Sequence, residues 1–295
     1  MKIVIVGAGA LGSVMAKILK QNRANSVALW DIVPGKVEKQ QPLGKILPSA
    51  DAVFLCMPTT ALRSAAMAIN PHLRRKALVI GMSKGIEDNT NLTLDRMLRK
   101  ILPWRQRIGL LFGPMLASEI ITGSCANAVL ASRTRITLLR IAKAFAETQL
   151  RVNLSHDVRG VALCGALKNV YAIGMGVIKA LGAGDNARGA YVAAATEEMR
   201  RIVRQLGGRE RTVYGYAGLA DLVATGLSES SRNHQVGCAL GNRSDCQGSE
   251  GSRAALSFSE LLGRKLGSFA ILHALVRVLD CGADPEEIAA AICRP

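Results

Sequence analysis

The sequence is poor in aromatic and acidic side chains. Phe, Trp and Tyr make up only 4% of its 295 residues, and 38 Lys and Arg face 22 Asp and Glu, which leaves a formal net charge of +16. A basic excess attracts either nucleic acid or anionic small molecules. Because few aromatic rings are available to stack on bases and the basic residues form no long tail, we expect no nucleic-acid partner. A basic surface that only interacts with solvent is the alternative.

Long apolar runs are lacking as well. The runs KIVIVGAGALG (2–12) and DAVFLCMP (51–58) are broken by Gly or Pro and are shorter than the roughly 18 residues that a membrane span needs. We therefore expect no membrane span. A single Lys precedes a strand-like run at the N-terminus, with no small-residue cleavage site, which predicts no signal peptide and a cytoplasmic protein.

Cysteine and histidine patterns that would indicate disulfides or metal sites are absent. The cysteines include no Cys-x-x-Cys pair and lie in mostly apolar stretches, which is typical of reduced thiols in a reducing compartment. The histidines show no ligand spacing with one another or with cysteine, so we expect no metal. These residues are Cys56, Cys125, Cys164, Cys238, Cys246, Cys281 and Cys293, and His72, His156, His234 and His273.

The first half of the chain alternates β-branched runs with helical patterns. Apolar residues recur at helical spacing in 11–21, 59–69, 91–102 and 134–150. Strands are predicted at 2–6, 27–30, 52–57, 77–82, 108–112, 126–131 and 151–156. This order is typical of a doubly wound, Rossmann-type parallel sheet.

The second half has no further β-runs. Long Ala-, Leu- and Gly-rich segments, at 161–181 and 188–206, predict helices. The polar stretch Arg243–Gly251 is the best candidate for a long loop. We therefore expect an α/β dinucleotide-binding domain over 1–155 and an all-α substrate-binding and catalytic domain over 156–295.

A glycine-rich motif, Gly7-Ala8-Gly9-Ala10-Leu11-Gly12, follows the first predicted strand and opens a helix. In this context the glycines allow a tight turn, close approach of the backbone to a pyrophosphate and close helix packing, and the helix N-terminus attracts negative charge. The motif predicts a dinucleotide site, to which Gly7, Gly9, Ala10, Leu11 and Gly12 contribute. An ordinary glycine-rich β–α turn is the alternative.

Asp31 ends the second predicted strand, 19 positions after Gly12. An acid at this place commonly accepts hydrogen bonds from the adenosine ribose and repels a 2′-phosphate. The position therefore favours NAD over NADP. Asp31 as a turn-capping residue before Pro34-Gly35 is the alternative, and Arg23 or Lys36 could still accommodate a phosphate.

Charged residues in apolar segments of the second half are further candidates. Lys168 and Asn169 interrupt the run GALKNVYAIG, where a buried ammonium without partners costs several kcal/mol. Asp221 lies similarly in AGLADLVATG, and Arg232 in SESSRNH offers a planar fork for an anion. Lys168 either has a functional partner or extends its charge to the surface.

Several segments together resemble the NAD(P)-dependent glycerol-3-phosphate dehydrogenases of the bacterial and eukaryotic cytosolic type. They occur in family order over nearly the whole chain: GAGALG (7–12), SKGIED (83–88), GPMLASE (113–119), GVALCGALKNVYAIGMG (160–176), LGAGDNARGA (181–190), AGLADLVATGLSESSRNHQVG (217–237) and EG (250–251). The resemblance implies reduction of dihydroxyacetone phosphate to sn-glycerol 3-phosphate, a precursor of glycerophospholipids, with NAD or NADP. It also implies a possible homodimer.

The resemblance also implies roles for individual residues. Lys168 is similar to the catalytic lysine of the family, Lys84 to the lysine at the junction of substrate and cofactor, and Asp221 to the acid that orders the lysine. Substrate contacts are implied for Lys84, Gly113, Met115, Lys168, Asp221, Thr225, Ser231, Arg232 and Asn233. Cofactor contacts beyond the glycine motif and Asp31 are implied for Lys84, Ala117, Arg232, Gly248 and Glu250.

Three departures from the family pattern bear on activity. Met115 stands where the family has Ser or Thr, Ala162 replaces a usual Glu, and only about twenty residues separate Asp31 from Asp51. A related dehydrogenase for another phosphorylated hydroxy compound is therefore one alternative. A ketopantoate-reductase-like enzyme and a non-catalytic dinucleotide-binding protein are the others.

Overall fold

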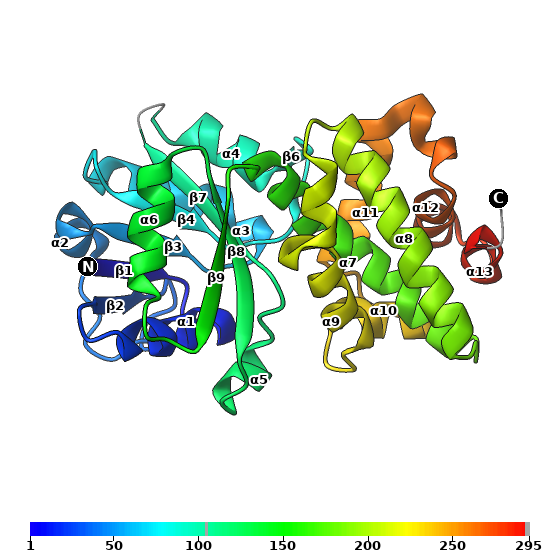
Figure 1. The fold of residues 1–295 in the computed structure, drawn as a ribbon, viewed down its shortest axis with the longest axis horizontal. Coiled ribbons are helices and arrows are strands. Elements are labelled where there is room, and N and C mark those ends of the chain that lie inside the picture. Colours follow the sequence, from blue (N-terminus) through cyan, green and yellow to red (C-terminus); the bar gives the residue numbers. More distant parts are fainter. Residues whose placement is uncertain (104–105, 293–295) are drawn as a thin grey trace. The chain divides into compact units, whose positions relative to one another are not determined.

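In the computed structural model, residues 1–103 and 106–292 are described. The chain separates into two compact units (Figure 1). The first consists of Met1–Ser83 and Leu94–Val158, and the second of Lys84–Thr93 and Arg159–Pro295. The short segment 84–93 thus leaves the first unit, packs with the second, and returns. As a consequence Lys84 belongs to the same unit as Lys168 and Asp221.

The first unit is built on a seven-stranded sheet with the strand order β2-β1-β3-β4-β7-β8-β9. All seven predicted strands are present. Their bounds are β1 Lys2–Val6, β2 Ser26–Trp30, β3 Ala52–Leu55, β4 Leu78–Gly81, β7 Arg107–Phe112, β8 Ala126–Ser132 and β9 Leu150–Ser155.

The sheet is not parallel throughout, which corrects one detail of the expected fold. Neighbouring strands from β2 to β7 are parallel, but β8 runs antiparallel to β7, with Gly109 opposite Ser132. β9 is parallel to β8. The connection from β7 to β8, residues 113–125, contains only the short helix α5 (Ala117–Ile121), whereas a parallel crossover usually runs through a longer helix that packs on the sheet.

Both faces of the sheet are covered, which explains its continuous apolar strands. In β1, Ile3 and Ile5 pack into a core shared with α1 (Ala10–Gln21). Val4 and Val6 point to the opposite face and are equally buried. The remaining helices of this unit are α2 Leu43–Ile46, α3 Thr59–Ile69, α4 Leu94–Ile101 and α6 Arg135–Ala144. Burial on both faces is the pattern of a doubly wound sheet.

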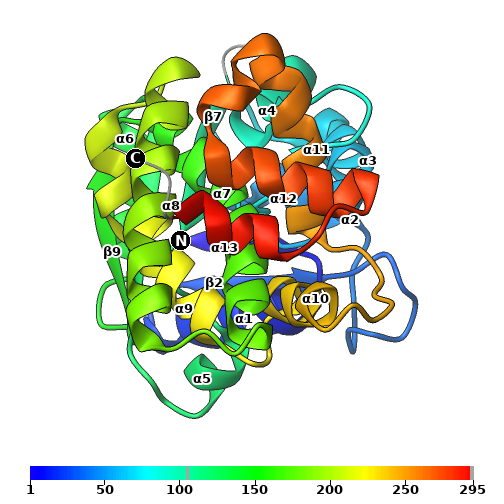
Figure 2. The same ribbon diagram turned by 90° about the vertical axis from the view of Figure 1, so that its right-hand side faces the viewer.

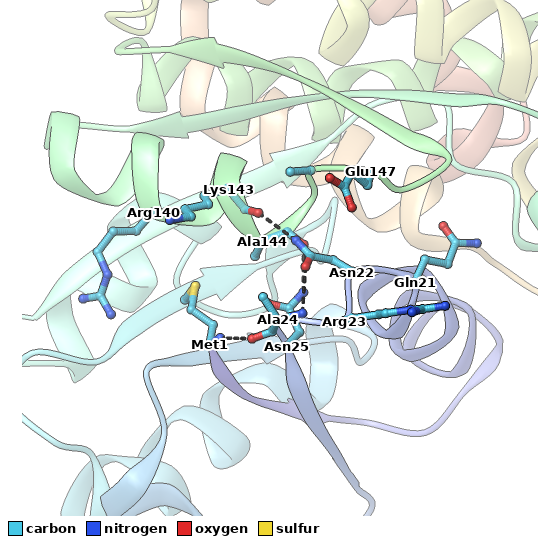
Figure 3. A pocket seen from close by; sticks show the side chains of 11 residues that line it. Met1, Gln21, Asn22, Arg23, Ala24, Asn25, Arg140, Lys143, Ala144 and Glu147 are labelled. Atoms are coloured by element: carbon cyan, nitrogen blue, oxygen red, sulfur yellow. Dashed lines mark hydrogen bonds between the residues drawn. The ribbon is translucent and has the colours of Figure 1, made fainter.

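The turn after α1 is tied to the end of α6 by two asparagines (Figure 3). The Asn22 side-chain amide donates to the Lys143 carbonyl at 3.0 Å, and the Asn25 amide donates to the Ala144 carbonyl at 2.8 Å. The Ala144 carbonyl lies in the last turn of α6, where carbonyls lack a partner within the helix, whereas the Lys143 carbonyl also accepts from the Ala146 amide. The two asparagine bonds fix the start of β2, and therefore the place of Asp31 at its end.

The second unit is helical, with one small exception. Its helices are α7 Val158–Ala180, which begins one residue before this unit, α8 Asp185–Gln205, α9 Asp221–Leu227, α10 Arg232–Gly241, α11 Glu250–Leu262, α12 Ala270–Cys281 and α13 Glu286–Ile292 (Figures 1 and 2). The exception is a two-stranded antiparallel hairpin, β5 Ile86–Glu87 and β6 Leu92–Thr93. The predicted loop ends at Ser249, so Glu250 and Gly251 are helical instead.

The helix α7 is central to the second unit. Glycines let its neighbours approach closely, because a Cβ at Gly174 would lie 1.9 Å from the Tyr191 hydroxyl of α8, and one at Gly176 would lie 2.2 Å from the His234 carbonyl of α10. α7 is long and apolar enough to cross a membrane, but the apolar stretch is entirely buried in the fold. A helix that is apolar all round is typical of a buried core position.

A buried glutamate links three helices of this unit. The Glu198 carboxylate, on α8, accepts hydrogen bonds from the Ile271 and Leu272 amides at 2.7 and 3.0 Å and from the Tyr171 hydroxyl at 3.0 Å. It therefore caps the N-terminus of α12 and holds α7 in place. Burial raises the pKa of Glu198, although these hydrogen bonds act in the opposite direction.

Candidate active site

The glycine motif forms the turn between β1 and α1. Gly7 has a φ of +101°, and a Cβ there would lie 2.4 Å from the Cys56 carbonyl oxygen. A Cβ on Gly12 would lie 1.8 Å from the Gly7 carbonyl oxygen, so both positions require glycine. At Gly9, the N-cap of α1, a Cβ would meet nothing within 4 Å, and no side chain caps the helix. The amides of Ala10 and Leu11 thus begin α1 beside open space, which fits a pyrophosphate.

Asp31 is held rigidly next to this turn. The carboxylate is buried and accepts hydrogen bonds from the Ala8 amide at 2.6 Å and the Val33 amide at 3.0 Å. It also forms an ion pair of 3.2 Å with Lys36. Burial by itself raises the pKa of Asp31, but these bonds outweigh it and lower the pKa below its usual value. The side chain is therefore a carboxylate at neutral pH.

A cavity of about 430 Å³ lies beside Gly7, Gly9 and Asp31. Its walls are mostly apolar and come from the ends of β2 and β3 and from α3, and Lys36 is the only cation among the described residues that line it. The other lining residues are Val6, Trp30, Ile32, Leu43, Cys56, Met57, Pro58, Ala61, Ser64, Ala65, Ala68 and Ile69. A mostly apolar cavity with one carboxylate in its lining suits an adenosine.

The second unit holds a cluster of two lysines around one carboxylate. The Asp221 carboxylate lies 2.5 Å from the Lys84 ammonium and 3.1 Å from that of Lys168. Lys168 also donates to the Thr225 hydroxyl at 2.7 Å, and Thr225 donates to Asp221 at 3.2 Å. Asp221 and Thr225 lie one turn apart on α9, so both side chains face α7. A π-helical turn, Tyr216–Ala220, directly precedes Asp221.

The Lys168 ammonium is unusual in being almost completely buried, with 5% of the residue exposed. Burial lowers its pKa to about 8, because desolvation and the nearby charge of Lys84 outweigh Asp221 and Glu250, which act in the opposite direction. The side chain does not extend to solvent, so the surface alternative for Lys168 is wrong. An ammonium with this pKa can give up and regain a proton near neutral pH.

Three asparagine and glycine contacts fix the backbone around Lys168. The Asn169 amide donates to the Lys84 carbonyl at 3.2 Å and accepts from the Asn233 amide at 2.9 Å. The Gly251 amide donates to the Asn233 side-chain oxygen at 3.0 Å. A Cβ on Gly251 would lie 2.4 Å from the Asn169 carbonyl, which makes glycine necessary there. Asn233 therefore joins α7, α10 and α11 at one point.

The N-terminus of α10 places Ser231 and Arg232. Ser231 is the N-cap and accepts from the His234 amide at 3.4 Å. The Arg232 guanidinium is exposed and donates to the Gln247 carbonyl at 3.0 Å. A cation at a helix N-terminus is available for an anionic group. His234 is buried, and its ring nitrogens have no hydrogen bond among the described residues.

The remaining predicted residues fall into both units. Gly113 follows β7, where a Cβ would lie 2.5 Å from the Asn127 carbonyl. Met115 is packed into the apolar core of the first unit, and Ala117 packs partly against it. In the second unit, Gly248 is exposed, and the charge of Glu250 acts on Lys168. The structure therefore brings together Lys84, Lys168, Asp221, Thr225 and Glu250 in one cluster.

Sequence reasoning missed the residues that line the apolar cavity, among them Trp30, Leu43 and Pro58. Trp30 and Pro58 lie at the carboxyl ends of β2 and β3, next to the glycine motif. Their place after predicted strands could have identified them as cavity residues, because ligands of such folds bind at the carboxyl ends of the strands. Leu43 had no signal, because it belongs to a four-residue helix in the shortened segment between Asp31 and Asp51. In this segment the described residues form only α2 and a 3₁₀ turn, Leu47–Ser49, in place of the longer helix and the strand that are usual there in such a domain.

Two family models match the chain. The N-terminal model of NAD-dependent glycerol-3-phosphate dehydrogenase matches residues 32–137, and the C-terminal model matches 157–290. A glycerol-3-phosphate dehydrogenase [NAD(P)+] of Acidithiobacillus ferrooxidans is 34% identical over 97% of this chain and 91% of its own length. One of Ectopseudomonas mendocina is 36% identical over 81% of this chain and 76% of its own length.

Solved structures agree with these matches. A glycerol-3-phosphate dehydrogenase from Coxiella burnetii has a TM-score of 0.87 at 25% identity, covering 100% of this chain and 99% of its own. The enzyme from Saccharomyces cerevisiae has a TM-score of 0.84 at 21% identity over 100% and 99%, which shows a shared fold. The family models and these relatives cover most of the chain, and the chain therefore belongs to the NAD-dependent glycerol-3-phosphate dehydrogenase family.

Proposed function

We propose that this protein transfers a hydride between a nicotinamide dinucleotide and dihydroxyacetone phosphate or sn-glycerol 3-phosphate. One observation supports the chemistry most directly: a buried lysine, Lys168, paired with Asp221 and next to a second lysine, Lys84. A buried ion cluster of this kind costs stability, and a catalytic task explains its presence. The choice of substrate rests on the relatives, which are named glycerol-3-phosphate dehydrogenases.

The reaction needs an acid at the ketone oxygen. When bound, a reduced nicotinamide would supply the hydride to the carbonyl carbon, and the electron pair of the C=O π bond would move to the oxygen. The resulting alkoxide takes one proton, which gives the alcohol and leaves the oxidised dinucleotide. An ammonium beside that oxygen stabilises the developing charge and donates the proton.

Lys168 is the residue that we assign as this acid. Its pKa of about 8 places the transfer near neutral pH, where both the ammonium and the amine are accessible. Asp221 and Thr225 accept hydrogen bonds that orient the Lys168 ammonium. Lys84 adds a second positive charge that favours an alkoxide and helps to lower the pKa of Lys168. In alcohol oxidation the neutral Lys168 amine takes the proton back.

Binding of the phosphate and of the dinucleotide falls to other groups. Arg232, with Ser231 and Asn233, would hold the substrate phosphate and orient the substrate without joining the chemical step. The first amides of α1 and the glycines before them would hold the pyrophosphate, and Asp31 would accept hydrogen bonds from the adenosine ribose. Gly248 and Glu250 would approach the dinucleotide, as would Ala117.

The direct test compares three ketone or aldehyde substrates. NADH oxidation is measured with dihydroxyacetone phosphate, glyceraldehyde 3-phosphate and ketopantoate. We expect turnover with dihydroxyacetone phosphate and much less with the other two. Preference for another substrate would favour a related dehydrogenase, and binding of NADH without any turnover would favour a non-catalytic role.

Replacement of Lys168 by Met tests the proton donor. Lys168→Met keeps the length and apolar packing, so folding and NADH binding should persist while kcat falls by roughly 10²–10⁴-fold, the usual contribution of general acid catalysis. Lys179→Met is the matched control, because Lys179 is an exposed lysine on the same helix. If Lys168→Met keeps more than about a tenth of the wild-type kcat, Lys84 becomes the better candidate.

Met115 and Ala162 favour a second candidate substrate. The Met115 thioether is buried in the apolar core, where the family pattern has a hydroxyl side chain, and Ala162 on α7 is buried as well. Both changes remove polar groups, so a different phosphorylated hydroxy compound is the second candidate substrate. A cytoplasmic location, a role in glycerophospholipid synthesis and pairing of two copies are further parts of this proposal.

A further inference from the structure

A second cationic site lies in the first unit, at the opposite end of the strands from the glycine motif. A groove of about 940 Å³ is lined by Arg74, Arg75, Lys76, Arg99 and Arg107, together with Gln106 and Thr134. Arg107 is the first residue of β7 and pairs in register with Leu78, the first residue of β4. The groove is therefore at the amino-terminal edge of the sheet, whereas Gly7 and Asp31 are at the carboxyl edge.

The cations of this groove are poorly neutralised. None of the described residues that line it is acidic. Arg74 shares Asp51 with Arg140, at 2.8 and 3.3 Å, so two guanidinium groups face one carboxylate. Arg75, Lys76 and Arg107 have no ion pair among the described residues. Several positive charges around one concavity repel one another, and an anion in the groove would relieve that repulsion.

Two further features suit a phosphate-bearing ligand. Thr134 is the N-cap of α6, whose first amides begin next to the groove without a side-chain cap. Arg99 is partly buried and donates to the Gln106 carbonyl at 3.3 Å, which keeps its guanidinium in place. Burial and the charge of Arg133 lower the pKa of Arg99, as expected for cations brought together without counter-charges.

The neighbouring cavity on the same edge shows the contrast (Figure 3). It is lined by Arg23, Arg140 and Lys143 but also by Glu147, and its backbone groups bond to Asn22 and Asn25. In that cavity the side-chain amides of Asn22 and Asn25 and the N-terminal amine of Met1 all donate to backbone carbonyls. In the groove, Arg75 is exposed and Arg107 is half-buried, and neither has an ion pair among the described residues.

We propose that this groove is a second ligand site, separate from the dinucleotide and substrate sites, that binds a small anion carrying two or more phosphate groups. Five cations around a concavity of this size match several phosphates better than one. The described lining contains no aromatic ring to stack a base and no large apolar side chain to enter a lipid layer. These features favour a small polyphosphate over nucleic acid or a membrane.

Calorimetric titration with inorganic tripolyphosphate tests the proposal. The wild-type protein, saturated with NADH to block the dinucleotide site, should bind about one tripolyphosphate, and the affinity should fall as NaCl is added. Arg75→Gln/Lys76→Gln should weaken binding by about tenfold or more, because it removes two charge-assisted contacts. Both residues are exposed, so the variant should fold. Arg107→Gln provides a second, independent variant.

Two controls distinguish this site from others. Arg264→Gln/Lys265→Gln removes the same charge from exposed positions of the second unit and should change the affinity by less than about twofold. Arg232→Ala should leave tripolyphosphate binding intact, which separates the groove from the substrate phosphate site. Equal losses in the groove variant and the Arg264/Lys265 variant, or loss in Arg232→Ala, would overturn the proposal.

The same variants decide between a small ligand and a surface. Sedimentation with vesicles of anionic phosphatidylglycerol, with and without tripolyphosphate, is the second measurement. If the vesicles bind through Arg75 and Lys76 while tripolyphosphate neither binds nor competes, the site recognises a membrane and the proposal is wrong. Absence of any tripolyphosphate binding refutes it equally.

Discussion

At the scale of single residues, the pKa of Lys168 predicts the pH dependence of activity. An acid catalyst works in its protonated form, so kcat/KM for ketone reduction should be constant at lower pH and fall tenfold per unit above about pH 8. In the oxidation direction the neutral amine is needed, so kcat/KM should rise with pH and level off above about 8. Profiles between about pH 6 and 10 measure both limbs. If activity instead changes near the ordinary lysine pKa, burial does not lower the pKa of Lys168 as we expect.

Arg232 is exposed and positioned by the start of α10, which predicts a binding role. Arg232→Ala should mainly raise KM for dihydroxyacetone phosphate, lowering kcat/KM by about 2–4 kcal/mol in free-energy terms if the phosphate is held in a desolvated ion pair. Steady-state kinetics with dihydroxyacetone and with its phosphate give the measurement. Only the phosphorylated substrate should respond, and an unchanged KM would exclude Arg232 from the site.

Asp31 predicts the choice of dinucleotide. Its pKa is lowered, so Asp31 carries a full negative charge, and at the place proposed for the ribose this charge should repel a 2′-phosphate. We expect kcat/KM to be higher with NADH than with NADPH. Because Lys36 pairs with Asp31, Lys36→Ala should widen this difference. Equal or better kinetics with NADPH would show that Lys36 decides the preference instead, without affecting the family assignment.

At the scale of elements, Glu198 predicts how firmly α12 is attached. Glu198→Ala leaves the buried amides of Ile271 and Leu272 without acceptors, which should lower the free energy of unfolding by about 2–4 kcal/mol. Urea denaturation measures the change. Glu197→Ala, at the exposed neighbouring position paired with Arg200, should cost less than about 1 kcal/mol. Similar losses in the two variants would contradict a capping role for Glu198.

At the scale of the whole molecule, the net charge predicts salt-dependent kinetics. A charge of +16 attracts an anionic substrate over a distance that salt shortens, from about 30 Å at 0.01 M to about 8 Å at 0.15 M. Raising NaCl should therefore raise KM for dihydroxyacetone phosphate more than it lowers kcat. Uncharged dihydroxyacetone is the control and should show little change. Equal salt effects on both substrates would assign the effect to stability rather than to attraction.

The local patterns of the sequence predicted the fold class, which the structure confirms, and the residues that we propose for the active site. Buried strands such as 2–6 are visible in the sequence as continuous apolar runs. The segment Gly7–Gly12 identified the turn because its glycines lie within six consecutive residues. Lys168 stood out because a charge inside an apolar helix needs a partner. These three predictions depend only on residues close together in the sequence, because the helix and strand periods fix which of those residues share a face.

The tertiary structure alone decided which distant residues meet. Lys84 and Asp221 are 137 positions apart, and no local pattern shows that the segment 84–93 leaves the sheet unit to pair with α9. The reversal of β8, the burial of Met115 and the basic groove at Arg75 and Arg107 also arise from packing between separate elements. Helical and strand periods fix which face of an element is apolar, but the free energy of burying those faces together chooses their partners.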